Sequence, residues 1–452
     1  MDRFRRLSLV VVLLGGLVAT GFATTLVKAS NPSSLPSGLL LTTNAESTAL
    51  YCTGLSSTGG LTGHVTFSNT SSNTRNITVQ VASDTGKRAT QNISLNAYAS
   101  ASLEPSQLVT GNSFGLAAAV DGAGVVGEEV SNDSKAQVPC VSAGVTDWYA
   151  GGFDTRVGSS ALISVFNPTA TPAVINVTLF SGAGYSAPGP LQGRSIGAHA
   201  QVELNLGQVA VNIQNVGVHI AALRGSIVVV GVEHSGKVSS LNPGSTTLAA
   251  SAVLPRVTTV NGAAATIFVA NPSAQVAKVT LQVVLSESQY TVAPLTLTVA
   301  PFRSGQLVIT PNPAIAASGY ATINFASTEP VIVTLATGTP LGVSLSPPVT
   351  AGREFLLSDF TGKGFGSATV TNEGSSPIEV TLSVVSNATG APQRSSVQIP
   401  KGVTSNIVGL FSIGTLTGAT LLITASRPTL VVSATLVTNP LGATIALPLN
   451  GG

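Results

Sequence analysis

One spacing pattern occurs four times along this chain and limits the folds that the chain can adopt. In each copy an asparagine has apolar residues two and four positions before it, and eight, ten and twelve positions after it. Apolar residues at every second position are typical of β-strands with one buried face, so each copy predicts a strand, a turn and a second strand. The four asparagines are Asn69, Asn167, Asn271 and Asn372.

The repeated asparagine has a local role at the turn. An asparagine side chain can accept a hydrogen bond from the backbone two residues further on, and a following proline presets the turn. Pro168 and Pro272 follow the second and third asparagines, whereas Thr70 and Glu373 follow the first and fourth. We therefore expect the asparagine to shape the turn, with proline helpful but not required.

The copies lie far enough apart for each to be a complete small domain. The asparagines are 98, 104 and 101 residues apart, which is longer than a solenoid repeat. Each copy contains about seven short strand patterns, so we predict an all-β fold of tandem immunoglobulin-like β-sandwich modules. The predicted modules are residues 41–140, 141–247, 248–350 and 351–452. No long or charged linker separates them, so they are expected to touch and to form a stiff rod or a curved stack.

The composition agrees with strands rather than helices. Charged residues make up only 8% of the chain, against about 25% in an average globular protein. Helix surfaces normally use Glu, Lys, Arg and Gln, so this chain has few residues with which to build them. The 44% of apolar residues are sufficient for each module to bury a core.

Residues 1–29 have the features of an export segment. A basic start precedes the apolar run Leu7–Val27, and Val27 and Ala29 provide small residues at the positions that a signal peptidase would read for cleavage before Ser30. The run of 21 residues is also long enough to span a bilayer, so a cleaved signal peptide and an uncleaved membrane anchor both stay open. Either way the rest of the chain is expected outside the membrane, after a Pro- and Ser-rich linker at residues 30–40.

The net charge argues against binding to nucleic acid. The whole chain has a formal net charge of +2, but residues 1–29 alone contribute +3. The remainder is therefore close to neutral and has no positive surface for a phosphate backbone.

The chain contains two cysteines, Cys52 and Cys140, on either side of the first repeat. In an exported protein such a pair is expected to form a disulfide, which would link the two ends of the first module. A redox or metal pair is the alternative, but neither the CxxC spacing nor a nearby histidine supports it.

The sequence has no pattern that predicts catalysis, a metal site or a cofactor. Glu128 and Glu129 are the densest acidic pair, yet neighbouring strand residues point to opposite faces, so we expect a solvated edge strand instead of a catalytic pair. Residues 361–367 resemble a phosphate-binding loop but lack its Lys-Ser or Lys-Thr ending. The histidines occur singly, without metal-ligand spacing, at His64, His199, His219 and His234.

Trp148 and Tyr149 are the candidate ligand-contact residues. Exposed aromatic faces stack on sugars, and Trp148 is the only tryptophan in the chain. A single tryptophan at a module boundary can instead fill the seam between two modules, and this packing role stays open beside the ligand role.

The segment around these residues resembles a family of exported actinobacterial proteins that is known only as a domain of unknown function. The resemblance rests on Trp148-Tyr149, Gly151-Gly152 and Asn167-Pro168, and on the surroundings of Cys52 and Cys140, and it is clear over the first two repeats. It implies secretion or anchoring and a β-rich body, and it provides no catalytic residues.

We therefore expect a non-enzymatic protein of the cell envelope that acts as a structural spacer or as an interaction scaffold. The alternative is an adhesin or carbohydrate-binding protein at the cell surface. Cell-wall polysaccharide or another envelope protein would be the partner, and residues 7–27 would hold the chain in the membrane if they are not cleaved.

Overall fold

The computed structural model describes residues 48–57, 62–131, 137–235, 238–257, 264–285, 292–309, 312–318, 321–339, 342–346, 354–360, 365–385, 393–406, 419–428, 430–436 and 443–445. The predicted signal or anchor at residues 1–29 and the linker at residues 30–40 lie outside these ranges. Among the residues that the structure describes, no helix is both long and apolar enough to cross a membrane.

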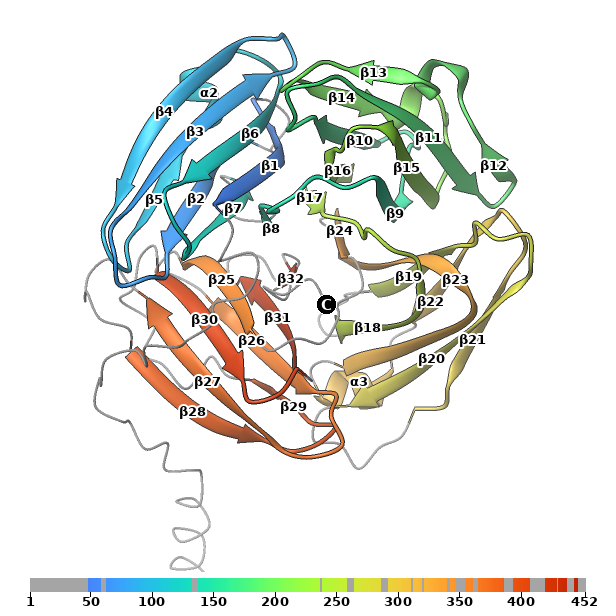
Figure 1. The fold of residues 1–452 in the computed structure, drawn as a ribbon. Coiled ribbons are helices and arrows are strands. Elements are labelled where there is room, and N and C mark those ends of the chain that lie inside the picture. Colours follow the sequence, from blue (N-terminus) through green and yellow to red (C-terminus); the bar gives the residue numbers. More distant parts are fainter. Residues whose placement is uncertain are drawn as a thin grey trace, which may run out of the picture.

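The strands form four successive β-sandwiches, each with two antiparallel sheets (Figure 1). In module 1 the first sheet has the strand order β1 (Ala49–Ser56), β6 (Ser113–Val120), β3 (Arg75–Ser83), β4 (Arg88–Leu95). The second sheet has the order β5 (Ser100–Leu103), β2 (Gly63–Asn69), β7 (Val125–Ser131), β8 (Gln137–Pro139). In module 2 the first sheet has the order β12 (Gly184–Ser186), β11 (Ala173–Ser181), β15 (Val216–Arg224), β9 (Asp147–Phe153), and β13 (Arg194–Ile196) also pairs with β11. The second sheet has the order β14 (Gln201–Asn205), β10 (Ser159–Phe166), β16 (Val228–Ser235), β17 (Val238–Asn242).

Modules 3 and 4 repeat this arrangement. In module 3 the long strand β23 (Ala321–Thr339) serves both sheets, pairing with β18 (Ala249–Val257) and β20 (Ala277–Leu285) and then with β19 (Ala264–Ala270) and β24 (Gly342–Ser346). Its outer strands are β21 (Leu295–Val299), beside β20, and β22 (Ser304–Ile309), beside β19. In module 4 the first sheet has the order β25 (Glu354–Phe360), β30 (Ala419–Ala425), β27 (Ile378–Val385), β28 (Gln393–Ile399). The second sheet has the order β29 (Thr404–Asn406), β26 (Phe365–Asn372), β31 (Leu430–Leu436), β32 (Ala443–Ile445). Short helices α2 (Pro105–Leu108), η1 (Gly189–Leu191), η2 (Leu206–Gln208) and α3 (Pro313–Ser318) lie in connections.

The structure confirms the all-β prediction, but the strand order differs from that of an immunoglobulin domain. In module 1 one sheet has the order first, sixth, third, fourth, and the other sheet has the order fifth, second, seventh, eighth. Constant-type immunoglobulin domains share the second–fifth and third–sixth pairs, but place their first strand beside the second, their fourth beside the fifth and their seventh beside the sixth. The first, fourth and seventh strands of module 1 thus lie in the opposite sheet from their immunoglobulin counterparts. Pairing order depends on contacts between distant residues, which the alternation within a strand does not encode.

Each module has a core formed by the alternating apolar residues. Along β11, for example, Ala173, Ile175, Val177 and Leu179 are buried while the residues between them are partly exposed. The strands that follow each repeated asparagine in modules 1, 3 and 4 alternate in the same way. Burial of these side chains is the main force that holds each sandwich together.

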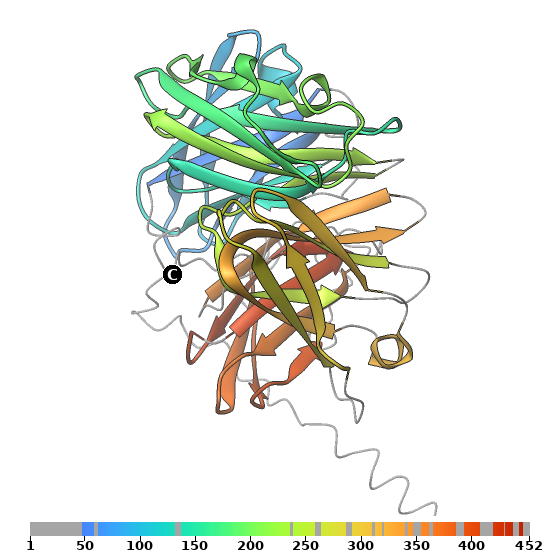
Figure 2. The same cartoon turned by 90° about the vertical axis from the view of Figure 1, so that its right-hand side faces the viewer.

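The four sandwiches close into a ring, as Figures 1 and 2 show from two directions. The last strands of the modules, β8, β17, β24 and β32, contact one another in cyclic order near the centre, and β32 of module 4 contacts β8 of module 1. Strand β25 of module 4 also contacts β2 of module 1. The expected rod or curved stack is therefore replaced by a closed ring in which every module has two neighbours.

Candidate functional site

The repeated asparagine connects two turns of its module through its side chain. Asn167 is fully buried, and its Nδ2 donates to the backbone oxygens of Thr171 at 2.8 Å, Ile196 at 3.2 Å and Gly197 at 2.9 Å. Its Oδ1 accepts hydrogen bonds from the backbone N–H of Thr169 at 2.9 Å and from the Thr169 hydroxyl at 2.8 Å. We call this arrangement the Asn clamp. It includes the bond to the backbone two residues further on that the sequence predicts.

The other three modules contain the same clamp. Asn69, Asn271 and Asn372 are also fully buried, and each donates to three backbone oxygens and accepts from the backbone N–H two residues on. Two of the three oxygens belong to a second turn, which lies between β4 and β5 in module 1, β13 and β14 in module 2, β21 and β22 in module 3, and β28 and β29 in module 4. The clamp therefore fixes the position of that turn relative to the turn that carries the asparagine.

The clamped turn holds one residue with positive φ in every module. These residues are Tyr98, His199, Phe302 and Gly402, with φ of 58°, 48°, 55° and 65°. Side chains other than glycine rarely occupy this left-handed region, so three bulky residues there indicate a contact that stabilises them. The contact in modules 1 to 3 is with the preceding module of the ring.

Module 3 shows this contact most clearly. The Phe302 ring lies 5.4 Å from the ring of Tyr185 in module 2, and the neighbouring Arg303 donates from Nη1 to the Gly182 oxygen of module 2 at 2.9 Å. In module 2, His199 helps line a small cavity with Arg88 of module 1. Each of these turns therefore lies against the module before it.

The same relation joins modules 4 and 1. Burial raises the pKa of Tyr98 in module 1, and the nearby Arg394 guanidinium of module 4 partly offsets that rise. The clamped turn of module 1 thus faces module 4, which is its predecessor only in a closed ring.

The seam between modules 1 and 2 contains a buried polar cluster. Thr53 Oγ1 lies 2.8 Å from Ser164 Oγ and donates to Gln201 Oε1 at 2.9 Å, while Gln201 Nε2 donates to Ser164 Oγ at 2.6 Å. All three side chains are buried, so each satisfies the hydrogen-bonding needs of the others across the seam.

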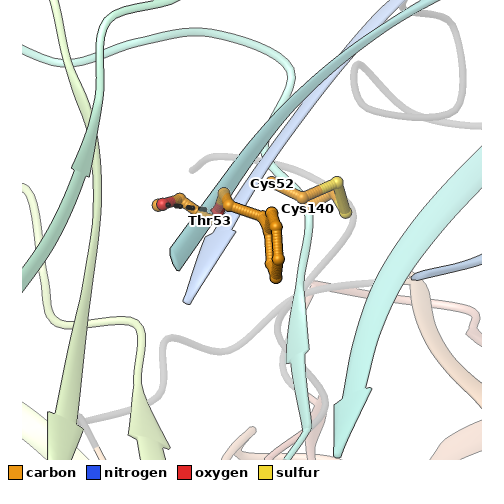
Figure 3. The surroundings of a disulfide bond; sticks show 4 residues. Cys52, Thr53 and Cys140 are labelled. Atoms are coloured by element: carbon orange, nitrogen blue, oxygen red, sulfur yellow. Dashed lines mark hydrogen bonds between the residues drawn. A yellow bond between two sulfur atoms is a disulfide. The ribbon is translucent and has the colours of Figure 1, made fainter. Parts of the chain in front are cut away.

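Cys52 and Cys140 form the predicted disulfide, which lies beside this cluster (Figure 3). Their Cα atoms are 4.6 Å apart, and 88 residues separate them in the sequence. The bond joins β1 to the segment just after β8, so it links the two ends of module 1 next to the seam with module 2.

Two neighbouring glycines let modules 2 and 3 approach closely. The N–H of Gly151 donates to Thr334 Oγ1 of module 3 at 3.0 Å. Gly152 has a φ of 84°, and a Cβ atom there would lie 2.5 Å from the Phe268 ring of module 3. This contact explains the glycine at position 152, because any larger residue there would push the modules apart.

A cavity of about 280 Å³ opens at this seam. Its lining includes the polar side chains of Asp154, Arg156 and Glu233 of module 2, and Thr266 and the Phe268 ring of module 3. Asp154 and Arg156 form a two-pronged ion pair, with the Arg156 Nη2 atom 2.7 Å from Asp154 Oδ2. The groups that line this cavity could interact with a small ligand, and it is the best candidate site among the described residues.

Glu233 and Glu129 are buried glutamates with raised pKa values, which the sequence did not predict. Burial raises the pKa of Glu233 to about 9, and the negative charge of Asp154 adds to the rise, while a hydrogen bond from the Asp154 N–H partly offsets it. Burial likewise raises the pKa of Glu129 to about 8, with a smaller opposing effect from the N–H groups of Thr53 and Leu55. Both side chains are therefore uncharged at neutral pH. For Glu233 the signal was present in the sequence, since this residue follows the apolar run at the start of β16.

The prediction of a solvated edge strand for Glu128 and Glu129 was wrong. Strand β7 lies between β2 and β8 and is not an edge strand, and Glu128 and Glu129 are 6% and 1% exposed. Alternation along the strand was correctly expected to place the two side chains on opposite faces. It did not show that both faces of β7 are covered.

Trp148 is a packing residue of module 2. It is 2% exposed, and its Nε1 donates to the Pro243 oxygen at 2.7 Å, in the segment that leads to module 3. Gly244 has a φ of 65° and lies so close that a Cβ atom there would be 2.4 Å from Nε1 of Trp148. The ligand-contact role proposed for Trp148 is thus corrected, because its ring presents no open face to a sugar.

Tyr149 occupies a different environment from its neighbour. It is partly buried and stacks on His219 with ring centroids 4.4 Å apart, and His219 Nε2 lies 2.9 Å from Asp147 Oδ1. The hydrogen bond with His219 lowers the pKa of Asp147. One face of Tyr149 is thereby used within module 2, and the candidate ligand role of this residue stays a prediction.

The structure does not bring the histidines together. His219 is in β15 and His234 is in β16, where its Nδ1 lies 2.8 Å from Ser239 Oγ. His64 is in β2 and His199 is in the clamped turn of module 2. Within the described ranges, no three His, Cys, Asp or Glu side chains are grouped so that they could hold a metal ion.

Comparisons with known proteins identify a family but give no activity. The model of one family, described as a family of unknown function (DUF5719), matches residues 134–408, and no curated protein matches the sequence. The matched segment includes the Trp-Tyr, Gly-Gly and Asn-Pro pairs, but it begins after most of module 1.

Two solved structures show weak similarity. One is a tetra-tandem repeat in the extending region of a large adhesion protein, with 14% identity, 92% of this chain and 98% of that chain covered, and a TM-score of 0.12. The other is the Streptomyces avermitilis α-L-rhamnosidase complexed with L-rhamnose, with 8% identity, 93% and 45% coverage, and a TM-score of 0.16. TM-scores this low do not inform the function of the chain.

Proposed function

The chain belongs to this family of unknown function, and we propose that it is a non-enzymatic interaction scaffold of the cell envelope. In this proposal residues 1–29 direct the chain out of the cytoplasm. The ring of four sandwiches then presents its loops and seams to a partner.

The observation that carries the proposal is the closure of the four modules into a ring. A spacer gains reach by placing modules end to end, whereas a ring of four modules is little longer than two modules side by side. Closure instead brings loops from four modules, far apart in the sequence, into one surface of fixed geometry. Of the two roles expected from the sequence, the ring therefore favours the scaffold over the spacer.

The seams support this role because they hold the modules in fixed relative positions. Buried polar side chains bridge modules 1 and 2, and hydrogen bonds between backbone groups and side chains cross the seam of modules 2 and 3. Asn215 of module 2, for instance, donates from Nδ2 to the Gly305 oxygen at 2.8 Å, and Ser304 Oγ of module 3 donates to the Asn215 oxygen at 2.8 Å. A surface of fixed shape loses little conformational entropy when it binds a partner.

Position-specific photo-crosslinking in the native host tests the proposal. A photo-reactive amino acid replaces one exposed apolar residue at a time, at Val157 or Leu223 in module 2 or at Val276 in module 3, which are 102%, 62% and 46% exposed. A membrane-impermeant amine reagent, applied to intact cells, determines whether the chain is outside the membrane.

The proposal predicts labelling from outside and an adduct of defined mass whose yield depends on the position of the probe. If the chain is protected from the reagent, or if none of the three positions gives an adduct above that of the unirradiated control, the proposal is wrong.

A further inference from the structure

The cavity between modules 2 and 3 has a wall that is electrically neutral. Asp154 and Arg156 neutralise each other through three side-chain contacts of 2.7 to 3.1 Å. Glu233 is 2% exposed and uncharged at neutral pH, since burial holds its pKa well above the usual range. A charged ligand would therefore lose its hydration without gaining an opposite charge, so the cavity favours an uncharged ligand.

The polar groups of the cavity can both donate and accept hydrogen bonds. The side chains of Gln214 and Gln306 each offer an amide N–H and an amide oxygen, Thr266 offers a hydroxyl, and protonated Glu233 offers one O–H and one carbonyl oxygen. Hydroxyl groups of a ligand also donate and accept, so they suit such a wall better than groups that only accept or only donate.

The module 3 side of the cavity adds apolar surface. The Phe268 ring, Ala336 and the half-exposed Val308 lie on the same sheet face as Thr266 and Gln306, because Phe268 pairs with Gln306 and Val308 pairs with Thr266. Gly152 leaves the Phe268 ring in place, because a side chain at position 152 would collide with that ring. A ligand that fits the cavity therefore needs C–H groups for this apolar surface and hydroxyl groups for the polar side chains.

These features belong together in a sugar ring, and we propose that the cavity binds one uncharged pyranose or furanose unit. Its volume of about 280 Å³ lies at the small end of ligand sites and allows a single sugar ring rather than an oligosaccharide. The site involves residues of both modules, so only a chain with this seam intact would bind. The inference is independent of the scaffold role, since a sugar could bind whether or not the ring also binds a partner.

Saturation-transfer NMR with the full chain tests this inference. The probes are D-glucose, D-galactose, D-mannose, D-xylose and L-arabinose, each up to about 50 mM, and a single sugar in a site of this size is expected to bind with a Kd of about 1–10 mM. Ala264 is exposed at the rim of the cavity, so Ala264→Trp should fill the cavity without disturbing the core. Val276→Trp, at an exposed position of the same module outside the cavity, is the matched control.

Two further variants test the role of Glu233. Glu233→Gln keeps an uncharged group that donates and accepts, and it should retain binding within about threefold. Glu233→Leu removes both functions and should weaken binding at least about tenfold, with the melting temperature measured for both variants.

The inference predicts saturable binding of at least one sugar that Ala264→Trp abolishes and Val276→Trp leaves unchanged. It is overturned if none of the five sugars saturates, or if the Ala264→Trp variant binds as well as the unmodified chain. Photo-crosslinking from Leu223 and Val276 reports on the scaffold role separately, because neither residue lines the cavity.

Discussion

Replacing the asparagine of one clamp is expected to destabilise its module severely. In Asn167→Ala, the backbone oxygens of Thr171, Ile196 and Gly197 lose the N–H groups that now lie within 3.2 Å, and the Thr169 N–H loses its acceptor. Buried groups left without a partner cost about 1–3 kcal/mol each, although some of these oxygens can regain partners by small movements. We therefore expect a loss of about 3–5 kcal/mol in the free energy of unfolding.

Asn167→Asp sharpens this prediction. Its size is the same, but at neutral pH a carboxylate oxygen would face the three backbone oxygens that now receive hydrogen bonds. We expect a loss at pH 7 at least as large as that of Asn167→Ala, with partial recovery near pH 4, where a protonated carboxyl can donate one bond. Asn176→Ala is the control, because the Asn176 side chain accepts one exposed bond, from the Gly193 N–H, and its loss should cost under about 1 kcal/mol.

Urea unfolding followed by tryptophan fluorescence measures these effects directly. Trp148 is the only tryptophan and lies in the core of module 2, so its signal reports on the module that carries Asn167. With a denaturant slope of about 2 kcal/mol per M, the midpoint for Asn167→Ala should fall by about 1.5–2.5 M. If its midpoint differs from that of Asn176→Ala by no more than experimental error, the clamp does not have the structural role assigned to it.

Three further outcomes follow from the buried groups. Because the folded-state pKa of Glu129 is raised to about 8, unfolding releases a proton between roughly pH 4.5 and 8, so stability should fall by up to about 1.4 kcal/mol per pH unit in that range. Glu129→Gln should remove the Glu129 contribution and so reduce the slope in unfolding curves of module 1 measured from pH 5 to 9, while Glu233 in module 2 keeps its own contribution. An unchanged slope for module 1 would refute the assignment. Reduction of the Cys52–Cys140 disulfide, which closes a loop of 88 residues, should cost about 4–5 kcal/mol in the chain-entropy model and lower the melting temperature of module 1 in calorimetry. Gly244→Ala should lower the midpoint reported by Trp148, because a Cβ atom would collide with the indole, and a midpoint equal to that of the unmodified chain would contradict this packing.

The sequence was sufficient to predict the strands and the local bond of the clamp. Apolar residues at every second position, such as Ile175, Val177 and Leu179 after Asn167, are buried in the structure. The bond from the backbone of Thr169 to Asn167 is local and was expected for that reason. These features depend on residues close together in the chain, where periodicity and turn preferences carry the information.

The ring and the cavity could not be predicted in the same way. The Asn clamp reaches Ile196 and Gly197, and Phe302 reaches Tyr185 of the preceding module, through contacts between distant residues. Glu233 is neutral only because module 2 folds around it. Pairing between modules leaves no regular pattern in the sequence, so the structure shows a closed ring in place of the expected rod.

Small-angle X-ray scattering of the purified chain in solution tests the closed ring most directly. A compact particle of about 400 residues has a radius of gyration of about 21 Å, and four sandwiches closed into a ring should measure about 22–27 Å. Four sandwiches placed end to end, each about 35 Å long, would give about 35–40 Å and a correspondingly longer maximum dimension. A value in the lower range is the predicted result, whereas a value in the upper range would contradict ring closure and the functional proposal that rests on it.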